Sequence, residues 1–250
     1  MLALLRRRRE DRRLARLPWP DTLWENNIAD WPVAARYQGA ARRQLHGMAM
    51  RFLMRKHIAS GGDMKITDEV SLRIATMAAV PVLELGLDWY RDFSSVIVYA
   101  HPFVPPHEQE DEYGVVHVNY HPLGGEAWPD GPVILSWEDV LRCGRDGYNV
   151  VIHEFAHKLD MRHDGPNGAP PLHADMDPGR WQEVFTAAWE DLERAVEEEQ
   201  EDLPVDPYAL EDAGEFFAVT SEAFFETPRR LQRYWPGVYE QLSLFYRQQP

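Results

Sequence analysis

The chain contains very little cysteine: Cys143 is the only one in 250 residues. A single thiol can form no intrachain disulfide, and it cannot supply a thiolate cluster for a metal ion. Disulfide-free chains are typical of reducing compartments, so we expect this protein in the cytoplasm.

Long apolar runs are also absent. A membrane-spanning helix needs about 20 consecutive apolar residues, and the longest candidate, IATMAAVPVLELGL, is interrupted by Pro81 and Glu84. The apolar LALL at the start is too short for the hydrophobic core of a signal peptide. The sequence therefore predicts neither a transmembrane segment nor a secretory leader.

Positive charge is scarce outside the first residues. The chain has 41 acidic and 26 basic side chains and a net charge of −15, which argues against direct binding to nucleic acid. The segment RRRREDRRLAR concentrates seven arginines near the start. We expect residues 1–16 to be a basic tail, mobile or loosely helical. The alternative is a patch that touches anionic lipid or an acidic partner.

The remaining chain, residues 17–250, shows no repeat and no linker, so we expect one domain with a helical N-terminal part. Apolar residues at helical spacing predict helices over 41–57 and over 68–80, the second ending near Pro81. Runs rich in β-branched residues predict strands over 94–104, 113–122 and 131–137, and turn residues fill LGGEAWPDG between the last two. These elements predict an α+β fold with a small sheet.

The second half of the chain has helical patterns. Residues 139–160 predict one or two helices with a break near Gly144 and Gly147, and residues 162–172 predict a loop. Asp177 and Pro178 are typical of an N-cap and a first helical position. Apolar residues then follow one face of the next helix, and further helices are expected over 214–228 and 239–248.

The stretch HEFAH, residues 153–157, carries the chemistry. On a helix, His153 and His157 lie on one face, so two imidazoles can bind a single metal ion. Glu154 lies beside the first histidine and is placed to act on a metal-activated water. The pattern is typical of zinc peptidases, but a catalytic zinc also needs a third protein ligand.

Several side chains are candidates for the third ligand. His163 lacks the spacing of the extended histidine motif, and we interpret His163 and His173 as loop histidines. A later segment, GEFFAVTSEAFFE, offers Glu215, Glu222 and Glu226. Glu215 stands beside two phenylalanines, where burial of an acid is costly unless it has a partner. The alternative for Glu215 is an acid favoured by the dipole of a helix N-terminus.

The blocks HEFAHKLD and DPYALEDAGEFFAVTSEAFF, with PVLELGLDWY, PFVPP and GPVILSW, resemble the Mlc titration factor A family of bacterial zinc metallopeptidases. The arrangement is also similar to the catalytic domain of anthrax lethal factor. The resemblance covers the chain from about Leu17 onward. It implies a zincin-like metallopeptidase domain.

The resemblance also implies roles for individual residues. His153, His157 and Glu215 match the three zinc ligands, one zinc ion per chain, and Glu154 matches the general base. Tyr208 stands seven residues before Glu215, as does a catalytic tyrosine in lethal factor. The alternative for Tyr208 is a loop tyrosine packed under the last helices.

Two functions from different classes follow from the resemblance. The first is hydrolysis of peptide bonds, with small aminopeptidase-type substrates accepted. The second is a regulatory role, in which the protein binds the Mlc repressor of the glucose regulon and removes it from DNA. A structural or vestigial metal site is a third reading, which the presence of Glu154 disfavours.

Asp160 is a further candidate for the site. It is either a hydrogen-bond acceptor for a ligand histidine or a plain surface acid.

Overall fold

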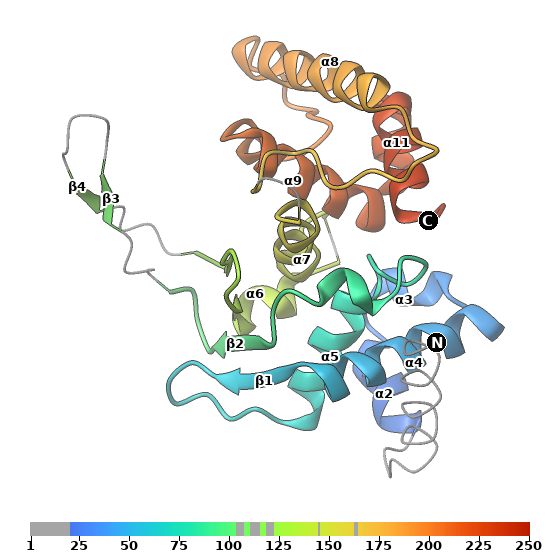
Figure 1. Cartoon of the computed structure of the whole chain (residues 1–250), viewed down its shortest axis with the longest axis vertical. Coiled ribbons are helices and arrows are strands. Elements are labelled where there is room, and N and C mark those ends of the chain that lie inside the picture. The colour runs from blue at the N-terminus through green and yellow to red at the C-terminus, as the bar shows by residue number, and fades with distance from the viewer. Residues whose placement is uncertain (1–20, 104–107, 111–115, 119–122, 145, 163–164) are drawn as a thin grey trace.

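The computed structural model describes residues 21–103, 108–110, 116–118, 123–144, 146–162 and 165–250 (Figure 1). The basic segment and His163 lie outside this range. Helices precede, interrupt and follow the strands, so the α+β class is confirmed. The elements up to the last strand are α2 (Asp21–Ile28), α3 (Pro32–Arg36), α4 (Gly39–Arg55), β1 (His57–Ser60), α5 (Asp68–Ala79), η1 (Leu87–Tyr90), β2 (Ser95–Tyr99), β3 (Glu108–Glu110), β4 (Val116–Val118), β5 (Gly125–Ala127) and β6 (Val133–Ser136).

The second half of the chain is helical, as expected. Its elements are α6 (Trp137–Arg142), α7 (Val150–Asp160), α8 (Pro178–Glu197), η2 (Pro207–Leu210), α9 (Ala213–Glu226), α10 (Pro228–Tyr234) and α11 (Pro236–Tyr246). None of the helices in the described ranges has the length and apolar character needed to cross a bilayer.

A four-stranded mixed sheet has the order β1-β2-β6-β5. β1, β2 and β6 are parallel, and β5 pairs antiparallel with β6, Glu126 opposite Ile134. β3 and β4 form a separate antiparallel pair. β5 is an edge strand of this sheet, and helix α7, which follows the sheet in the chain, packs against it.

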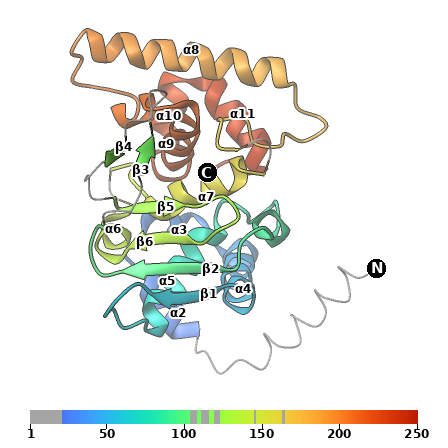
Figure 2. The same ribbon diagram turned by 60° about the vertical axis from the view of Figure 1, so that its left-hand side comes forward.

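Helix α7 lies between the edge strand β5 and helix α9 (Figure 2). α5 and η1 also contact α7, while α8 packs on η2 and α11, farther from the sheet. Contacts on so many sides explain why every residue of α7 is buried. The ring of Phe155 packs 4.9 Å from that of Tyr90 and 5.6 Å from that of Phe52, which anchors the back of α7 to the N-terminal helices. A buried phenylalanine contributes about 2–3 kcal/mol of hydrophobic stabilisation.

The expected break between two helices is confirmed. α6 ends at Arg142 and α7 begins at Val150, and both intervening glycines have left-handed backbones, with φ of 93° at Gly144 and 101° at Gly147. Residues with a Cβ rarely adopt such angles. The Asn149 side chain accepts a hydrogen bond from the Ile152 N–H at 3.0 Å and so caps α7. Asp177 caps α8 in the same way, as predicted.

The sequence was wrong about two strands. Residues 125–127 were expected within a turn, but they form β5, and β1 was not expected at all. Both are short, and Gly125, Glu126 and Ala127 are residue types that strands disfavour. Pairing with β6 overrides that preference. The predicted strand over 113–122 is described only at β4, Val116–Val118.

Candidate metal centre

Helix α7 presents both histidines of the HEFAH stretch on the face toward α9. The Nε2 atoms of His153 and His157 are 3.2 Å apart, and the ring centroids are 4.8 Å apart. One helical turn separates the two residues, so both rings reach the same point in space.

Helix α9 presents three carboxylates toward α7. Glu215, Glu222 and Glu226 are spaced by seven and four residues, which places them along one helical face. The remaining faces are mostly apolar, and all four phenylalanines of α9 are buried: Phe216, Phe217, Phe224 and Phe225. Glu215 and Glu222 contact α7, and Glu226 contacts its N-cap Asn149 and also Trp31.

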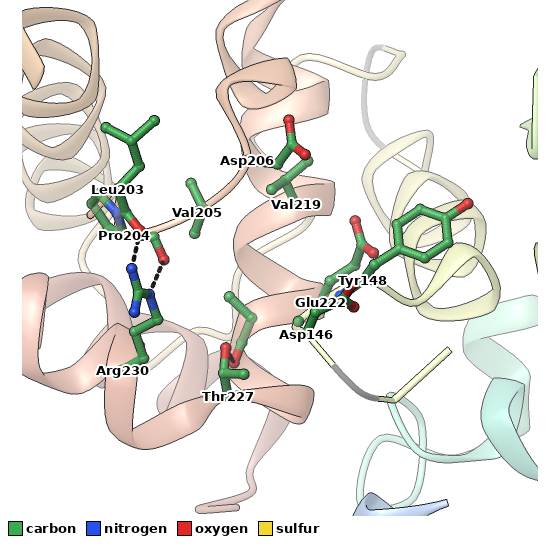
Figure 3. A pocket seen from close by; sticks show the side chains of 12 residues that line it. Asp146, Tyr148, Leu203, Pro204, Val205, Asp206, Val219, Glu222, Thr227 and Arg230 are labelled. Atoms are coloured by element: carbon green, nitrogen blue, oxygen red, sulfur yellow. Dashed lines mark hydrogen bonds between the residues drawn. The ribbon is translucent and has the colours of Figure 1, made fainter. Parts of the chain in front are cut away.

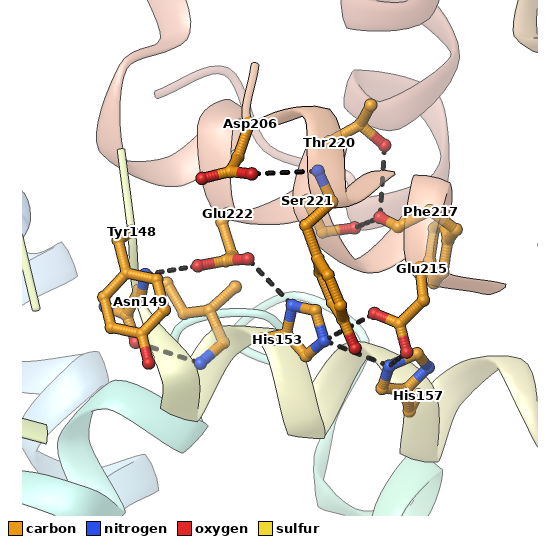
Figure 4. A network of polar contacts seen from close by, with 12 residues as sticks. Tyr148, Asn149, His153, His157, Asp206, Glu215, Phe217, Thr220, Ser221 and Glu222 are labelled. Atoms are coloured by element: carbon orange, nitrogen blue, oxygen red, sulfur yellow. Dashed lines mark hydrogen bonds and ion pairs between the residues drawn. The ribbon is translucent and has the colours of Figure 1, made fainter. Parts of the chain in front are cut away.

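Glu215 is the carboxylate that meets both imidazoles. Its Oε2 lies 2.9 Å from Nε2 of His153, and its Oε1 lies 3.3 Å from Nε2 of His157. The three side chains offer ligand atoms that all lie within 4.8 Å of one another. Figure 4 shows the carboxylate of Glu215 between α9 and the two rings. Asp212 caps α9 by accepting a hydrogen bond from the Glu215 N–H at 2.9 Å, which fixes the backbone of Glu215.

The charges in this cluster favour a cation. Burial opposes a charge on His153, but contacts with Glu215 and Glu222 outweigh it and raise its pKa well above the ordinary value. Burial likewise opposes ionisation of Glu215, yet the two histidines hold the pKa of this carboxyl far below its usual range. Positive charge between the rings is thus stabilised by a carboxylate on each side of His153.

Glu222 and Glu226 lie behind the cluster. Oε1 of Glu222 lies 2.8 Å from Nδ1 of His153, and its Oε2 accepts a hydrogen bond from the Asn149 N–H. Glu226 accepts hydrogen bonds from Asn149 Nδ2 at 2.5 Å and from Trp31 Nε1 at 3.0 Å. Because Glu222 is an acceptor, Nδ1 of His153 donates its hydrogen to Glu222, so Nε2 is the ring nitrogen that faces Glu215 and His157 and that a metal ion would bind.

Glu154 faces the sheet beside the cluster. Its carboxyl group is buried, and this burial raises its pKa to about 8. A Cβ on Gly125 would lie 2.5 Å from Oε1 of Glu154, so the edge strand makes room for this side chain only because residue 125 is a glycine. The side chain of Glu154 therefore lies between α7 and β5.

Tyr208 lies on the other side of His153. Asp206 accepts a hydrogen bond from the Tyr208 N–H at 2.9 Å and so caps η2. The Tyr208 ring centroid lies 6.2 Å from that of His153, and half of the side chain is exposed. Burial of the rest and the nearby Glu215 raise the pKa of its phenol, which therefore remains a hydrogen-bond donor. Tyr208 is not packed out of reach under the last helices.

The structure also places Asp160, His173 and Tyr148. Asp160 is buried and accepts a hydrogen bond from the Gly168 N–H at 2.7 Å, so it is not a surface acid. Its Oδ1 and Nδ1 of His157 both lack a hydrogen-bond partner among the described residues, so the two side chains are not hydrogen-bonded to each other. His173 hydrogen-bonds to the Phe245 carbonyl oxygen at 2.8 Å, as a loop histidine would. Tyr148, which the sequence did not single out, has its hydroxyl beside Gly124, the residue just before β5. In the sequence, Tyr148 is marked only by its position directly before Asn149, the N-cap of α7.

The donor set suits a metal ion. Two imidazole nitrogens and a carboxylate are ligands that zinc prefers. The Nε2 atoms of the two histidines face each other at 3.2 Å, a position from which both can bind one cation. Oε2 of Glu215 is buried without an aligned hydrogen-bond partner among the described residues, although Nε2 of His153 is 2.9 Å away. Both observations fit side chains arranged around one shared cation.

Comparisons with known proteins agree with this geometry. Residues 5–247 match the profile of the family described as "Glucose-regulated metallo-peptidase M90". Proteins named Mlc titration factor A are similar over most of the chain. The one from Pectobacterium atrosepticum is 35% identical, covering 94% of this chain and 92% of its own length. Those from Salmonella arizonae and Klebsiella pneumoniae are each 34% identical, covering 92% and 91% of this chain and 92% and 86% of their own lengths.

These matches cover nearly the whole chain, far more than the HEFAH helix alone. The small mixed sheet, the buried HEFAH helix and the later glutamate-bearing helix form a zincin-like arrangement. The chain belongs to the glucose-regulated metallo-peptidase M90 family.

Proposed function

We propose that this protein is a zinc-dependent peptidase in which His153, His157 and Glu215 bind the metal ion. The observation that carries the proposal is the convergence of three ligand atoms within 4.8 Å, beside a buried glutamate. A zinc ion held there would supply Lewis acidity and a nucleophilic water at neutral pH. The family supports a metallo-peptidase, and the nitrogen and oxygen donor set supports zinc.

Glu154 is the proposed general base. A carboxyl group whose pKa lies near neutrality can both accept and return a proton. It would take a proton from the attacking water and deliver it to the leaving amine. Its position against β5 would place it beside the metal ion without making it a ligand.

Two further residues assist in this proposal. The hydroxyl of Tyr208 would donate a hydrogen bond to the substrate carbonyl oxygen as negative charge develops there. Glu222 accepts the hydrogen bond from His153 Nδ1 and keeps Nε2 available to the metal. Small peptides with a free N-terminus are the substrates we expect first.

The test uses purified full-length protein and an internally quenched peptide. We expect about one zinc per chain by elemental analysis. Glu154→Gln should keep the zinc and lose hydrolysis, whereas Glu215→Gln should lose both. Glu190→Gln, which changes an exposed acid on α8, is the matched control.

Full hydrolysis by Glu154→Gln would overturn the mechanism. Zinc loss in Glu222→Gln but not in Glu215→Gln would overturn the ligand assignment. Peptides with free and acetylated N-termini would test the aminopeptidase preference.

A second candidate function is supported by the name of the relatives, Mlc titration factor A. In this reading the chain binds an Mlc-type transcriptional repressor and sequesters it from DNA. The Glu154→Gln protein separates the two functions, because it should bind the repressor as well as the wild type while cleaving no peptide. Binding that requires Glu154 would contradict an independent sequestering role.

A further inference from the structure

Helices α7 and α9 run in opposite directions. Asn149, at the start of α7, contacts Glu222 and Glu226 in the second half of α9, whereas His157, near the end of α7, meets Glu215. One flank of the second half of α9 borders a cavity of about 480 Å³, to which it contributes Val219, Glu222 and Ala223 (Figure 3). Side chains that line a cavity lack partner atoms across the gap, so packing on this flank does little to hold the helix. The position of the first turn of α9 therefore depends on contacts at its own end.

The first turn of α9 contacts the loop that follows α7. Gly168 in this loop lies against Ala213, the first residue of α9, and a Cβ on Gly168 would be 2.4 Å from the Ala213 carbonyl oxygen. A Cβ on Gly214 would be 3.0 Å from the carbonyl oxygen of Pro166 in the same loop. Two glycines thus let one backbone approach the other closely. Glu215 is the next residue, so the loop lies directly against the turn that carries this carboxylate.

Gly168 is held by two further helices. Its N–H donates a hydrogen bond at 2.7 Å to Oδ2 of Asp160, at the end of α7. Its carbonyl oxygen accepts a hydrogen bond at 3.0 Å from Nε1 of Trp181, on α8. Asp160 is fully buried, so water does not compete for its bond to the loop. Three helices therefore meet at Gly168, α7 and α8 through hydrogen bonds and α9 through backbone contact.

We propose that Asp160 is a positioning residue for Glu215 and acts through Gly168. Asp160 fixes the loop, and the loop fixes the first turn of α9. That turn sets the distances from the Glu215 carboxylate to Nε2 of His153 and of His157, which are 2.9 Å and 3.3 Å. The proposal rests on the assignment of Glu215 as a metal ligand. The helix that carries the two histidines would thus also place the carboxylate that completes the site.

Gly168→Ala and Gly165→Ala form a matched pair of variants. Both glycines belong to the same loop and have left-handed backbones, with φ of 74° at Gly168 and 87° at Gly165. Alanine is strained at either position, but a Cβ meets Ala213 at residue 168 and nothing within 4 Å at residue 165. Competition with a coloured chelator measures zinc affinity. It should fall by about 10–100-fold in Gly168→Ala, as for residues that support metal ligands, and should stay close to the wild-type value in Gly165→Ala.

Asp160→Asn and Asp160→Ala separate the hydrogen bond from the charge, and they keep the test decisive if Gly168→Ala does not fold. Asparagine retains an oxygen that can accept from the Gly168 N–H, whereas alanine has none. We expect near wild-type zinc affinity in Asp160→Asn and a loss of about tenfold or more in Asp160→Ala. Equal losses in the two variants would overturn the proposal, because the charge and not the hydrogen bond would then act on the site. Unchanged affinity in Asp160→Ala would overturn it as well.

Hydrogen exchange in the metal-free protein distinguishes this proposal from the assignment of the metal site. The amides of Glu215 and Phe216 donate to Oδ1 and to the carbonyl oxygen of Asp212, within the first turn of α9. Both amides should exchange faster in Asp160→Ala and Gly168→Ala than in Gly165→Ala, because the turn opens locally. The amides of α4 should not change, which controls for a general loss of stability.

Faster exchange confined to the first turn of α9, in a protein whose wild type binds no zinc, would support the positioning role and overturn only the metal assignment. Zinc binding by the wild type, with unchanged exchange of the first turn in Asp160→Ala and Gly168→Ala, would overturn the positioning role and leave the peptidase proposal intact. Acceleration that is equal in α4 and in the first turn would also overturn it, since Asp160 would then stabilise the fold as a whole.

Discussion

The Nδ1 atom of His153 lies 2.8 Å from Oε1 of Glu222, two helical turns along α9 from Glu215. One helix therefore contacts both nitrogens of the same imidazole, with Glu215 near Nε2 and Glu222 at Nδ1. A carboxylate acceptor fixes the tautomer of a metal-binding histidine and raises the basicity of the ring. The relationship makes Glu222 a positioning residue.

Glu222→Gln should weaken zinc binding without abolishing it. The amide oxygen still accepts from His153 Nδ1, but it lacks the charge that strengthens the imidazole as a ligand. Loss of such a partner typically costs about 10–100-fold in metal affinity. Competition with a coloured chelator would measure the change. An unaltered affinity would show that Glu222 serves only to hold α7 and α9 together.

Gly125→Ala should impair turnover more than metal binding. The new Cβ would lie 2.5 Å from Oε1 of Glu154 and 2.7 Å from Cγ2 of Val150, so the carboxyl group must move. Displacement of a reacting group by about 1 Å can cost about 10²-fold in rate. Overpacking should also reduce the free energy of unfolding by about 1–3 kcal/mol.

The measurements for Gly125→Ala are kcat, zinc content and the melting temperature. Gly47→Ala is a suitable control, because Gly47 lies within α4 and a Cβ there would meet only Arg51 at 3.4 Å. Alanine should be neutral or slightly stabilising at that helical position. Normal kcat in Gly125→Ala would mean that the position of Glu154 does not limit the reaction.

Tyr208→Phe should lower kcat by about 10²–10³-fold if the hydroxyl donates to the developing oxyanion. The ring is retained, so zinc content and melting temperature should barely change. KM should move less than kcat, because the donor acts mainly in the transition state. Tyr99→Phe, at the end of β2, removes a hydroxyl elsewhere and should leave the kinetics unchanged. Wild-type turnover by Tyr208→Phe would remove the phenol from the mechanism.

Asp160→Asn should make stability less dependent on pH. Burial raises the pKa of Asp160 to about 6 from an ordinary 3.8. The folded protein therefore resists ionisation of this group: the cost is absent below pH 4 and fully present above pH 6. Asparagine keeps an acceptor for the Gly168 N–H, which donates to Asp160 at 2.7 Å.

Urea unfolding of wild type and Asp160→Asn at pH 4 and pH 7.5, at equal zinc content, would measure this effect. The variant should gain stability relative to the wild type as pH rises, by on the order of 2 kcal/mol. A difference in stability that is independent of pH would show that Asp160 titrates normally in the folded protein.

Local sequence was sufficient for the HEFAH helix and for its caps and breaks. Helical spacing places His153 and His157 on one face whatever surrounds them. The glycines of the break and the N-cap Asp177 were predicted, and the cap at Asn149, which was not predicted, also rests on a bond to a near neighbour. These features depend on residues within a few positions of each other, so the sequence alone determined them.

Helical spacing alone did not decide which carboxylate meets the imidazoles, although the family resemblance pointed to Glu215. Glu215, Glu222 and Glu226 share one face of α9, so spacing cannot rank them, and the docking of α9 on α7 brings Glu215 to both Nε2 atoms. Tertiary contacts also decided β5. Its residue types disfavour a strand, and it forms one because it pairs with β6. Contacts between segments distant in the chain set these outcomes, because they depend on how the helices and strands pack and not on local spacing.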